Sequence, residues 1–152
     1  MDTAQYTSFM REALVLAQKA QTLGEIPVGA VIVHKGKIIG RGHNLTRTNN
    51  DPSAHAEIVA IREAAQYLSN DRLQNCDLWV TLEPCAMCAG AIAHARIARL
   101  YYGAADEKAG AVDSGIQLFN QPTCHHVPEV YSGLEESESK NLLQQFFRDR
   151  RG

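Results

Sequence analysis

Four residues near the middle of the chain have side chains of the types that bind zinc or transfer protons. His55 and Glu57 lie two positions apart at the start of an expected helix over 54–68, and Cys85 and Cys88 open the next one. Residues three positions apart share one helix face, so both sulfurs are expected on the same side. Imidazole nitrogen and thiolate sulfur are ligands that zinc prefers. The spacing therefore predicts a zinc site, one ion per protomer, formed where two helices begin.

The residues next to these pairs favour helix starts. Ser53 is a good N-cap type, and Pro84 suits a first helical position, where its missing N–H costs nothing. Main-chain N–H groups at a helix start lower the pKa of a nearby thiol. Cys85 and Cys88 are therefore expected to be thiolates, ready to bind a metal.

Glu57 adds a proton-transfer group to the predicted zinc site. The three ligands His55, Cys85 and Cys88 leave the fourth zinc position open to water, as in catalytic zinc sites. Zinc lowers the pKa of such a water from about 16 towards about 7, which provides hydroxide at neutral pH. Glu57 is placed to accept the proton of that water and pass it on as a general acid–base. The pattern H-x-E…P-C-x-x-C is typical of zinc-dependent nucleobase deaminases.

Other interpretations of the cysteine pair remain open at this stage. A redox C-x-x-C normally accompanies a thioredoxin-like pattern, which is not found, and a disulfide is rare in cytoplasmic proteins. A closed structural zinc site needs a fourth protein ligand, for which the candidates are Cys76, Cys124 and His94. In that case the chain would be a zinc-stabilised binding module without catalytic activity.

The elements that must position these residues alternate along the chain. We expect helices over 3–22, 54–68, 85–95 and 134–150, strands over 26–33, 38–44, 78–82, 97–103 and 126–132, and a loop with one short helix over 104–126. This order predicts a three-layer α/β/α sandwich around a mixed sheet of roughly five strands. Gly40 and Gly42 indicate a bulge or a close backbone approach, and Pro128 indicates an edge strand.

Length and composition narrow the class of protein. The 152 residues fit a single domain over 1–152, and 45% apolar with 21% charged residues is typical of a globular protein. No run approaches the about 18 apolar residues of a membrane helix, and no signal peptide is recognised, so we expect a cytoplasmic protein. The net charge of −2 argues mildly against nucleic acid, although basic side chains gather in the segment 140–152.

From about residue 5 to its end, the sequence resembles the bacterial tRNA-specific adenosine deaminases of the cytidine deaminase-like superfamily. The likeness lies in IPVGAVIV, GHN, DPSAHAEIVAIREA, LWVTLEPCAMCAGAIAHARI, YYGAADEKAGA and LLQQFFRDRR. It implies a homodimer that converts adenosine to inosine at the wobble position of an arginine tRNA anticodon loop, releasing ammonia. Glu57 would protonate N1 of the base and later the leaving amine.

The resemblance also implies which residues contact the substrate. Asn44 would hydrogen-bond the purine, with main-chain N–H groups near Glu83 and Cys85 facing the transition state. The walls of the pocket would be formed by Ile26, Val28 and Ala54. The nucleotides next to the target base would be contacted by Asp106 and Lys108. The terminal helix would contact the RNA through Phe147 and Arg151. Of the adjacent Phe146 and Phe147, only one can pack inward, which leaves the other to stack on a base.

One segment of the chain differs from its expected relatives, and the zinc motif alone does not identify the substrate. Asn120 and Gln121, within the segment 116–126, stand where family members often carry histidines. Deaminases of free guanine, cytosine or a nucleotide have the same zinc motif, so a small-molecule deaminase is the alternative function.

Overall fold

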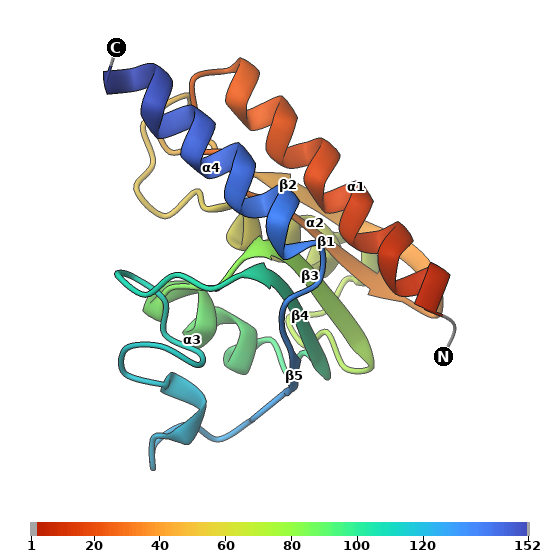
Figure 1. Cartoon of the computed structure of the whole chain (residues 1–152). Helices are drawn as coiled ribbons and strands as arrows, with labels where there is room; N and C mark the ends of the chain where they lie inside the picture. The colour runs from red at the N-terminus through yellow and green to blue at the C-terminus, as the bar shows by residue number, and fades with distance from the viewer. Residues whose placement is uncertain (1–2, 152) are drawn as a thin grey trace.

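The computed structural model describes the backbone of residues 3–151 and the side chains of residues 9–150 (Figure 1). A five-stranded sheet has the order β2-β1-β3-β4-β5, with β1 at Gly29–His34, β2 at Lys37–His43, β3 at Cys76–Leu82, β4 at Arg99–Ala104 and β5 at Glu129–Tyr131. β1 is antiparallel to both β2 and β3, whereas β3, β4 and β5 are mutually parallel. The predicted mixed sheet is confirmed.

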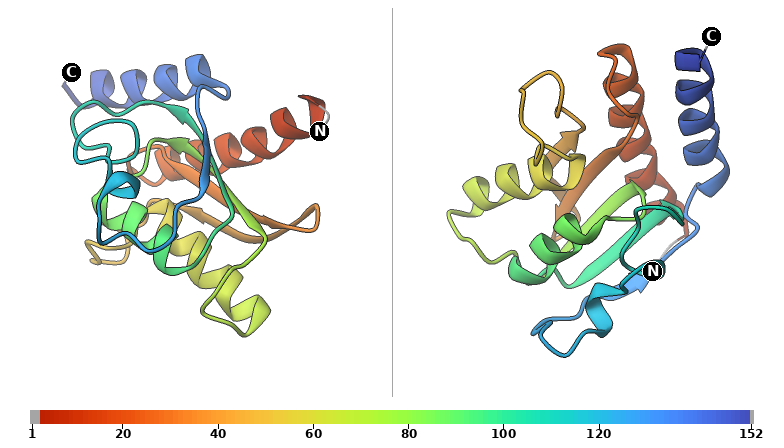
Figure 2. Two further views of the ribbon diagram at one scale, coloured as in Figure 1. Left: turned by 90° about the horizontal axis from the view of Figure 1, so that it is seen from below. Right: turned by 90° about the vertical axis from the view of Figure 1, so that its left-hand side faces the viewer.

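Helices cover both faces of this sheet. On one face lie α1 (Thr3–Thr22) and α4 (Glu136–Arg151), and on the other lie α2 (Ala56–Leu68) and α3 (Ala86–His94), as the two views in Figure 2 show. Each face has its own apolar cluster, because strand side chains alternate in direction. Met10 and Leu14 meet Val31 and Trp79 on the first face, and a larger cluster under α2 and α3 fills the second. The predicted three-layer sandwich is confirmed.

Element boundaries differ from the predictions by a few residues; His55 and Cys85 stand at helix starts as expected, but the N-cap role predicted for Ser53 and the first helical position predicted for Pro84 are wrong. The N-cap of α2 is His55 rather than Ser53, and the N-cap of α3 is Cys85, so Pro84 lies before the cap. Ser53 is engaged elsewhere, because both its N–H and its hydroxyl donate to Asp51. The short helix expected within 104–126 is η1, at Leu118–Asn120.

Gly42 allows α2 to lie directly on β2 at the end that carries His55. A Cβ atom at Gly42 would lie 2.2 Å from the carbonyl oxygen of Ala56, so only glycine permits this approach. The close backbone approach predicted for Gly40 and Gly42 is confirmed, and the β1–β2 register also shifts between Ile32 and Val33. This packing fixes the first turn of α2 against the sheet.

Pro128 immediately precedes β5, which is an edge strand as predicted. Among the described residues, no helix is both long and apolar enough to span a membrane.

Candidate active site

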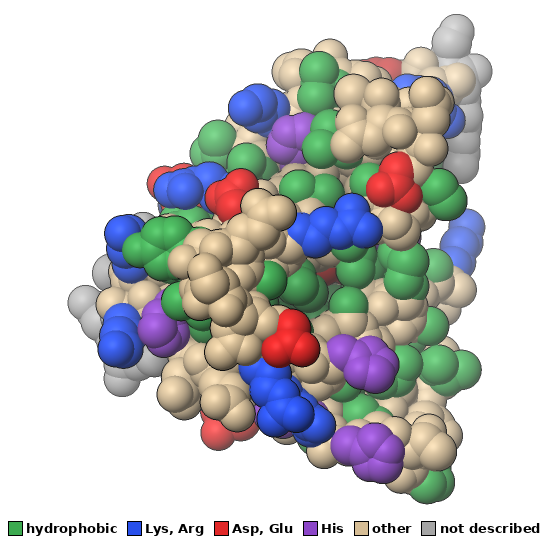
Figure 3. All heavy atoms as spheres, turned by 180° about the vertical axis from the view of Figure 1, so that it is seen from behind, with side chains coloured by type: hydrophobic (Ala, Val, Ile, Leu, Met, Phe, Trp, Pro, Cys, Tyr) green, Lys and Arg blue, Asp and Glu red, His purple; other side chains and the backbone are tan. Residues whose placement is uncertain are grey.

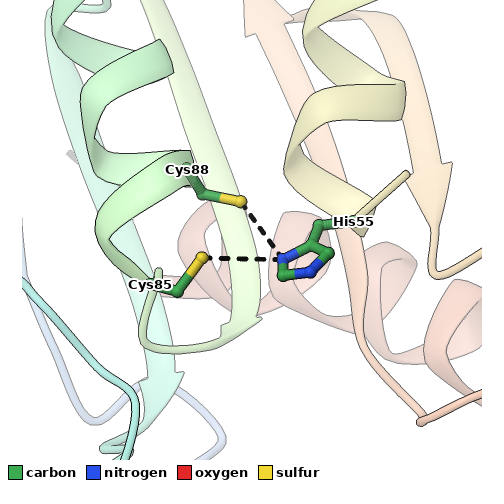
Figure 4. Close-up of side chains that lie close together, drawn as sticks. All are labelled: His55, Cys85 and Cys88. Carbon is green, nitrogen blue, oxygen red and sulfur yellow. Dashed lines mark hydrogen bonds between the residues drawn. The ribbon is translucent and has the colours of Figure 1, made fainter. Parts of the chain in front are cut away.

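Three potential metal ligands come from two helix starts that face each other. His55 is the N-cap of α2, Cys85 is the N-cap of α3, and neither side chain caps its own helix. Cys88 follows one turn later on α3, on the same side as Cys85 (Figure 4). Nδ1 of His55 points between the two sulfurs, at 3.6 Å from Cys85 Sγ and 3.5 Å from Cys88 Sγ.

These separations fit a tetrahedral zinc ion. With Zn–S near 2.3 Å and Zn–N near 2.0–2.1 Å, tetrahedral angles place nitrogen and sulfur ligands about 3.6 Å apart. The three ligand atoms of His55, Cys85 and Cys88 all lie within 4.8 Å of one another. One imidazole nitrogen and two sulfurs are a donor set of zinc enzymes that retain a water. The group therefore fits one zinc ion per chain.

Hydrogen bonds between the ligands separate their proton affinities. The pKa of Cys85 is lowered to about 4, first because the Cys88 thiol donates a hydrogen bond to it, although burial acts in the opposite direction. That same bond, together with burial, raises the pKa of Cys88. The hydrogen bond to Cys85 raises the pKa of His55. Metal ligands bind in their deprotonated forms, so zinc binding to this group releases protons.

Glu57 lies in the first turn of α2 with its side chain only 4% exposed. Burial raises the pKa of Glu57 from its ordinary 4.5 to about 7, and the negative charge of Cys85 acts in the same direction. In the described part of the chain, Glu57 is not a member of the metal-binding group. A carboxyl group with this pKa, next to metal ligands, has the proton affinity that suits general acid–base catalysis near neutral pH.

The described residues offer no fourth protein ligand for a closed zinc site. Their single group of three or more metal-binding side chains contains His55, Cys85 and Cys88 alone. Cys76 donates to the Gln74 carbonyl oxygen, and Cys124 donates to that of His126. All four cysteines are free thiols in this structure.

Asn44 ties the start of α2 to the segment before β1. Its side-chain oxygen accepts a hydrogen bond of 3.0 Å from Ala56 N–H, and its Nδ2 donates to the Ile26 carbonyl oxygen at 3.1 Å. An asparagine amide offers four hydrogen-bonding positions, so two remain for a ligand. The purine contact of Asn44 stays a prediction, and the capping role was not foreseen.

Replacing Asn44 by alanine is expected to lower the free energy of unfolding by about 1–3 kcal/mol, because the Ala56 N–H loses its buried partner. Urea denaturation followed by circular dichroism measures this loss. Asn49 is exposed in the following loop and supplies the matched control, since Asn49→Ala is expected to change stability by less than about 0.5 kcal/mol. Equal stabilities of the two variants would contradict the capping role of Asn44.

The three predicted wall residues differ in exposure. Ile26 is 41% exposed, whereas Val28 and Ala54 are 5% and 1% exposed. Ile26 therefore offers surface to a ligand directly. The contacts of Val28 and Ala54 with a substrate stay predictions.

Sequence reasoning missed two buried carboxylates that hold the loops on either side of the ligands. Glu25, 1% exposed, accepts hydrogen bonds from the main-chain N–H groups of Arg47 and Thr48 and from the hydroxyls of Thr46 and Thr48. Although burial acts to raise it, the pKa of Glu25 is lowered by these hydrogen bonds. Glu83, 2% exposed, plays the corresponding part for the segment 106–114. The only local signal was an acidic residue next to an apolar segment, with Glu25 directly before 26–33 and Glu83 directly after 78–82.

The two adjacent phenylalanines of α4 differ in burial, as predicted. Phe146 is 6% exposed and Phe147 is 44% exposed, so Phe147 is the side chain available to a partner. Arg150 donates to the Gly24 carbonyl oxygen, and its guanidinium lies 4.6 Å from the centre of the Phe146 ring. This arginine therefore holds α4 on the end of α1. The side chain of Arg151 lies outside the described part of the chain.

Comparison with known proteins agrees with this geometry. Residues 3–104 match the family model of the cytidine and deoxycytidylate deaminase zinc-binding region. A protein of Agrobacterium fabrum named tRNA-specific adenosine deaminase is 58% identical over 148 residues, which are 97% of each chain. A protein of the same name from Haemophilus influenzae is 50% identical over 157 residues, covering 99% of this chain and 91% of that one.

Two solved structures extend the comparison. One, from work on A-to-I editing by tRNA:A34 deaminases at the wobble position of transfer RNA, has a TM-score of 0.89 and 58% identity, and covers 90% of this chain and 99% of that one. The guanine deaminase of Bacillus subtilis has a TM-score of 0.65 and 35% identity, covering 98% and 95%. The chain belongs to the zinc-dependent cytidine and deoxycytidylate deaminase family, in the branch of the tRNA-specific adenosine deaminases.

Proposed function

We propose that this chain converts adenosine to inosine at the wobble position of a tRNA anticodon loop, with arginine tRNA as its substrate. The observation that carries the proposal is the three-ligand group with Glu57 buried beside it, in a chain 58% identical to a tRNA-specific adenosine deaminase. A tRNA substrate would place the protein in the cytoplasm. The activity would belong to a single domain over 1–152. The overall reaction consumes one water and releases ammonia.

Glu57 would carry the protons of this reaction. His55, Cys85 and Cys88 would hold the zinc ion, which would supply a water of lowered pKa for attack on C6 of the base. Glu57 would accept one proton of that water and donate it to N1, and would then take the remaining proton from the new hydroxyl on C6 and deliver it to the amino group, which leaves as ammonia while the C6 carbonyl forms. Burial raises the pKa of Glu57 above that of an ordinary carboxyl group, which favours its role as both acceptor and donor of protons.

A single-stranded loop suits a site of this kind. An anticodon loop allows the target base to be turned into a pocket at a low unstacking cost. Figure 3 shows that on the face seen from behind Figure 1, Lys and Arg side chains are dispersed rather than gathered in a patch. The exposed Lys108, Phe147 and Arg148 are the described candidates, with Arg151 and Asp106 as further predicted contacts.

Replacing Phe147 by alanine is expected to weaken tRNA binding by about 1–3 kcal/mol, because an exposed aromatic ring stacks on an unpaired base. The measurement is a binding titration with tRNA at fixed salt. Phe147 is 44% exposed, so its removal leaves the fold intact. Unchanged affinity in a folded Phe147→Ala variant would remove this contact from the proposal. Phe146→Ala provides the contrast, since loss of a buried ring costs about 3–5 kcal/mol of stability.

The proposal includes a homodimer with one zinc ion in each protomer. On α3, Met87 is 41% exposed, and a Cβ at Gly90 would meet nothing within 4 Å. This helix face has the small and apolar residues that allow close packing against a second copy. Sedimentation equilibrium distinguishes a dimer from a monomer.

The second candidate function is deamination of free guanine. The guanine deaminase of Bacillus subtilis is 35% identical and similar in fold, so the fold and the zinc motif do not separate the two activities. Arginine tRNA transcripts with adenosine or guanosine at the first anticodon position test the first proposal. Inosine is expected in the adenosine transcript alone, and inosine formation independent of the anticodon would contradict the proposed substrate.

A further inference from the structure

The Glu83 side chain accepts hydrogen bonds from both ends of the segment 106–114, which lies next to the metal ligands. It follows β3 directly and precedes Pro84 and Cys85 in sequence, and its side chain is 2% exposed. Its Oε1 accepts hydrogen bonds from Asp106 N–H at 3.0 Å and from the Ser114 hydroxyl at 2.9 Å. Its Oε2 accepts main-chain N–H bonds of 2.9–3.1 Å, from Val112, Asp113 and Ser114.

The charge of Glu83 is balanced by these donors rather than by a cation. Among the described residues, no lysine, arginine or histidine forms an ion pair with Glu83. Although burial acts to raise it, the pKa of Glu83 lies below its ordinary value because N–H groups of Asp106 and Ser114 donate to the carboxylate. The side chain therefore remains an anion at neutral pH, and each N–H bond to it is charge-assisted.

The segment held by Glu83 lies directly against a zinc ligand. Gly110 pairs with Cys85 through an isolated antiparallel bridge, and Ala111 N–H donates to the Pro84 carbonyl oxygen at 2.9 Å. A Cβ at Gly110 would lie 2.5 Å from the Glu83 carboxyl carbon, so the segment is in close contact with that side chain. The segment 106–114 therefore lies between the Glu83 carboxylate and the chain at Cys85.

The outer turn of the segment exposes groups that suit RNA. The Asp106 side chain accepts hydrogen bonds from the N–H groups of Lys108 and Ala109, which shapes the turn. Lys108 is exposed, and its ammonium group can pair with a backbone phosphate. The far end of the segment is fixed a second time, because the Tyr102 hydroxyl donates to the Asp113 side chain.

We propose that Glu83 is a positioning residue, whose buried carboxylate fixes the segment 106–114 so that its outer turn binds nucleotides next to the target base. This inference rests on the function proposed above. It assigns Glu83 no contact with the reacting atoms. A purely structural role would instead lower stability without a selective effect on substrate binding.

The test compares Glu83→Gln with Asp77→Asn. Glutamine keeps the shape of the side chain but turns an NH2 group toward N–H donors. Asp77 forms a 2.7 Å ion pair with Arg99 at the opposite end of β3, so Asp77→Asn is a control for a lost carboxylate remote from the site. Measurements are KM and kcat for tRNA, zinc per chain, and hydrogen exchange of the main-chain amides over 106–114.

Glu83→Gln is expected to raise KM at least about tenfold, the factor that corresponds to weakening one buried hydrogen bond. Zinc content and kcat should stay close to wild type, while amide exchange over 106–114 increases. Asp77→Asn should leave both KM and this exchange unchanged. An unchanged KM for Glu83→Gln, or a common fall of kcat and zinc content, would overturn the proposal.

Two further readouts keep the proposal testable in every case. If Glu83→Gln does not fold, Ser114→Ala removes one donor to the carboxylate and is expected to raise KM to a smaller extent; an unchanged KM contradicts the proposal. If the wild-type protein forms no inosine in tRNA, the proposed function fails by itself. Hydrogen exchange over 106–114 then still decides whether Glu83 fixes this segment.

Discussion

Glu57→Gln is expected to reduce turnover at least about a hundredfold while zinc content stays at one ion per chain. Glutamine has nearly the same size as glutamate, so it fills the buried position in the first turn of α2. It does not accept and return a proton near neutral pH, and the water and the leaving amine would lose their proton carrier. Because the metal-binding group contains only His55, Cys85 and Cys88 within the described residues, the zinc site should remain intact.

The measurement combines single-turnover inosine formation with metal analysis of the same preparation. Glu63 lies on the same helix with an exposed side chain, so Glu63→Gln removes one carboxylate without touching the site. This control is expected to retain wild-type turnover. Near-normal activity of Glu57→Gln would contradict the acid–base role, and loss of zinc would show that Glu57 supports the metal instead.

The second large effect is expected from Cys88→Ser. Cys88 is fully buried on α3 and lies 3.5 Å from His55 Nδ1, so its loss removes a ligand that no other described side chain replaces. Losing partners outside the ligand shell already costs about 10–100-fold in metal affinity. Removing a ligand itself is therefore expected to weaken zinc binding by at least about a hundredfold, with activity falling in parallel. A zinc titration against a chelator measures the affinity.

The matched control replaces the two cysteines outside this group. Cys76→Ser/Cys124→Ser should keep one zinc ion per chain, because these thiols donate to main-chain carbonyl oxygens and lie apart from the ligands. Release of zinc from the double variant would show that one of them completes a closed structural site. That outcome would refute the assignment of an open, catalytic zinc position.

The fold was largely predictable because its signals are local. Nearly continuous apolar runs such as those at 26–33 and 78–82 indicated strands, and the small residues of α3 and the apolar stripe of α2 indicated helices. The wrong N-cap of α2 has a nonlocal cause: Asn44, twelve residues earlier, accepts a hydrogen bond from Ala56 N–H at the start of that helix. A sequence pattern within α2 contains no information about that partner.

In the site too, local sequence signals were predictable and nonlocal contacts were not. His55, Cys85 and Cys88 lie in two short motifs, so their types and spacing were enough to predict that these three side chains come together in a group that fits zinc. The roles of Glu25 and Glu83 depend on segments more than 20 residues away in sequence, since Thr48 and Ser114 supply donors to them. Only the folded chain brings these partners together.

The most direct test of the account compares two substrates of the wild-type, zinc-loaded protein. Arginine tRNA with adenosine at the first anticodon position and free guanine are incubated separately, and inosine, xanthine and ammonia are quantified over time. The account predicts stoichiometric inosine and ammonia from the tRNA, at the anticodon position only, with no turnover of guanine. Rapid guanine deamination without inosine in tRNA would contradict it.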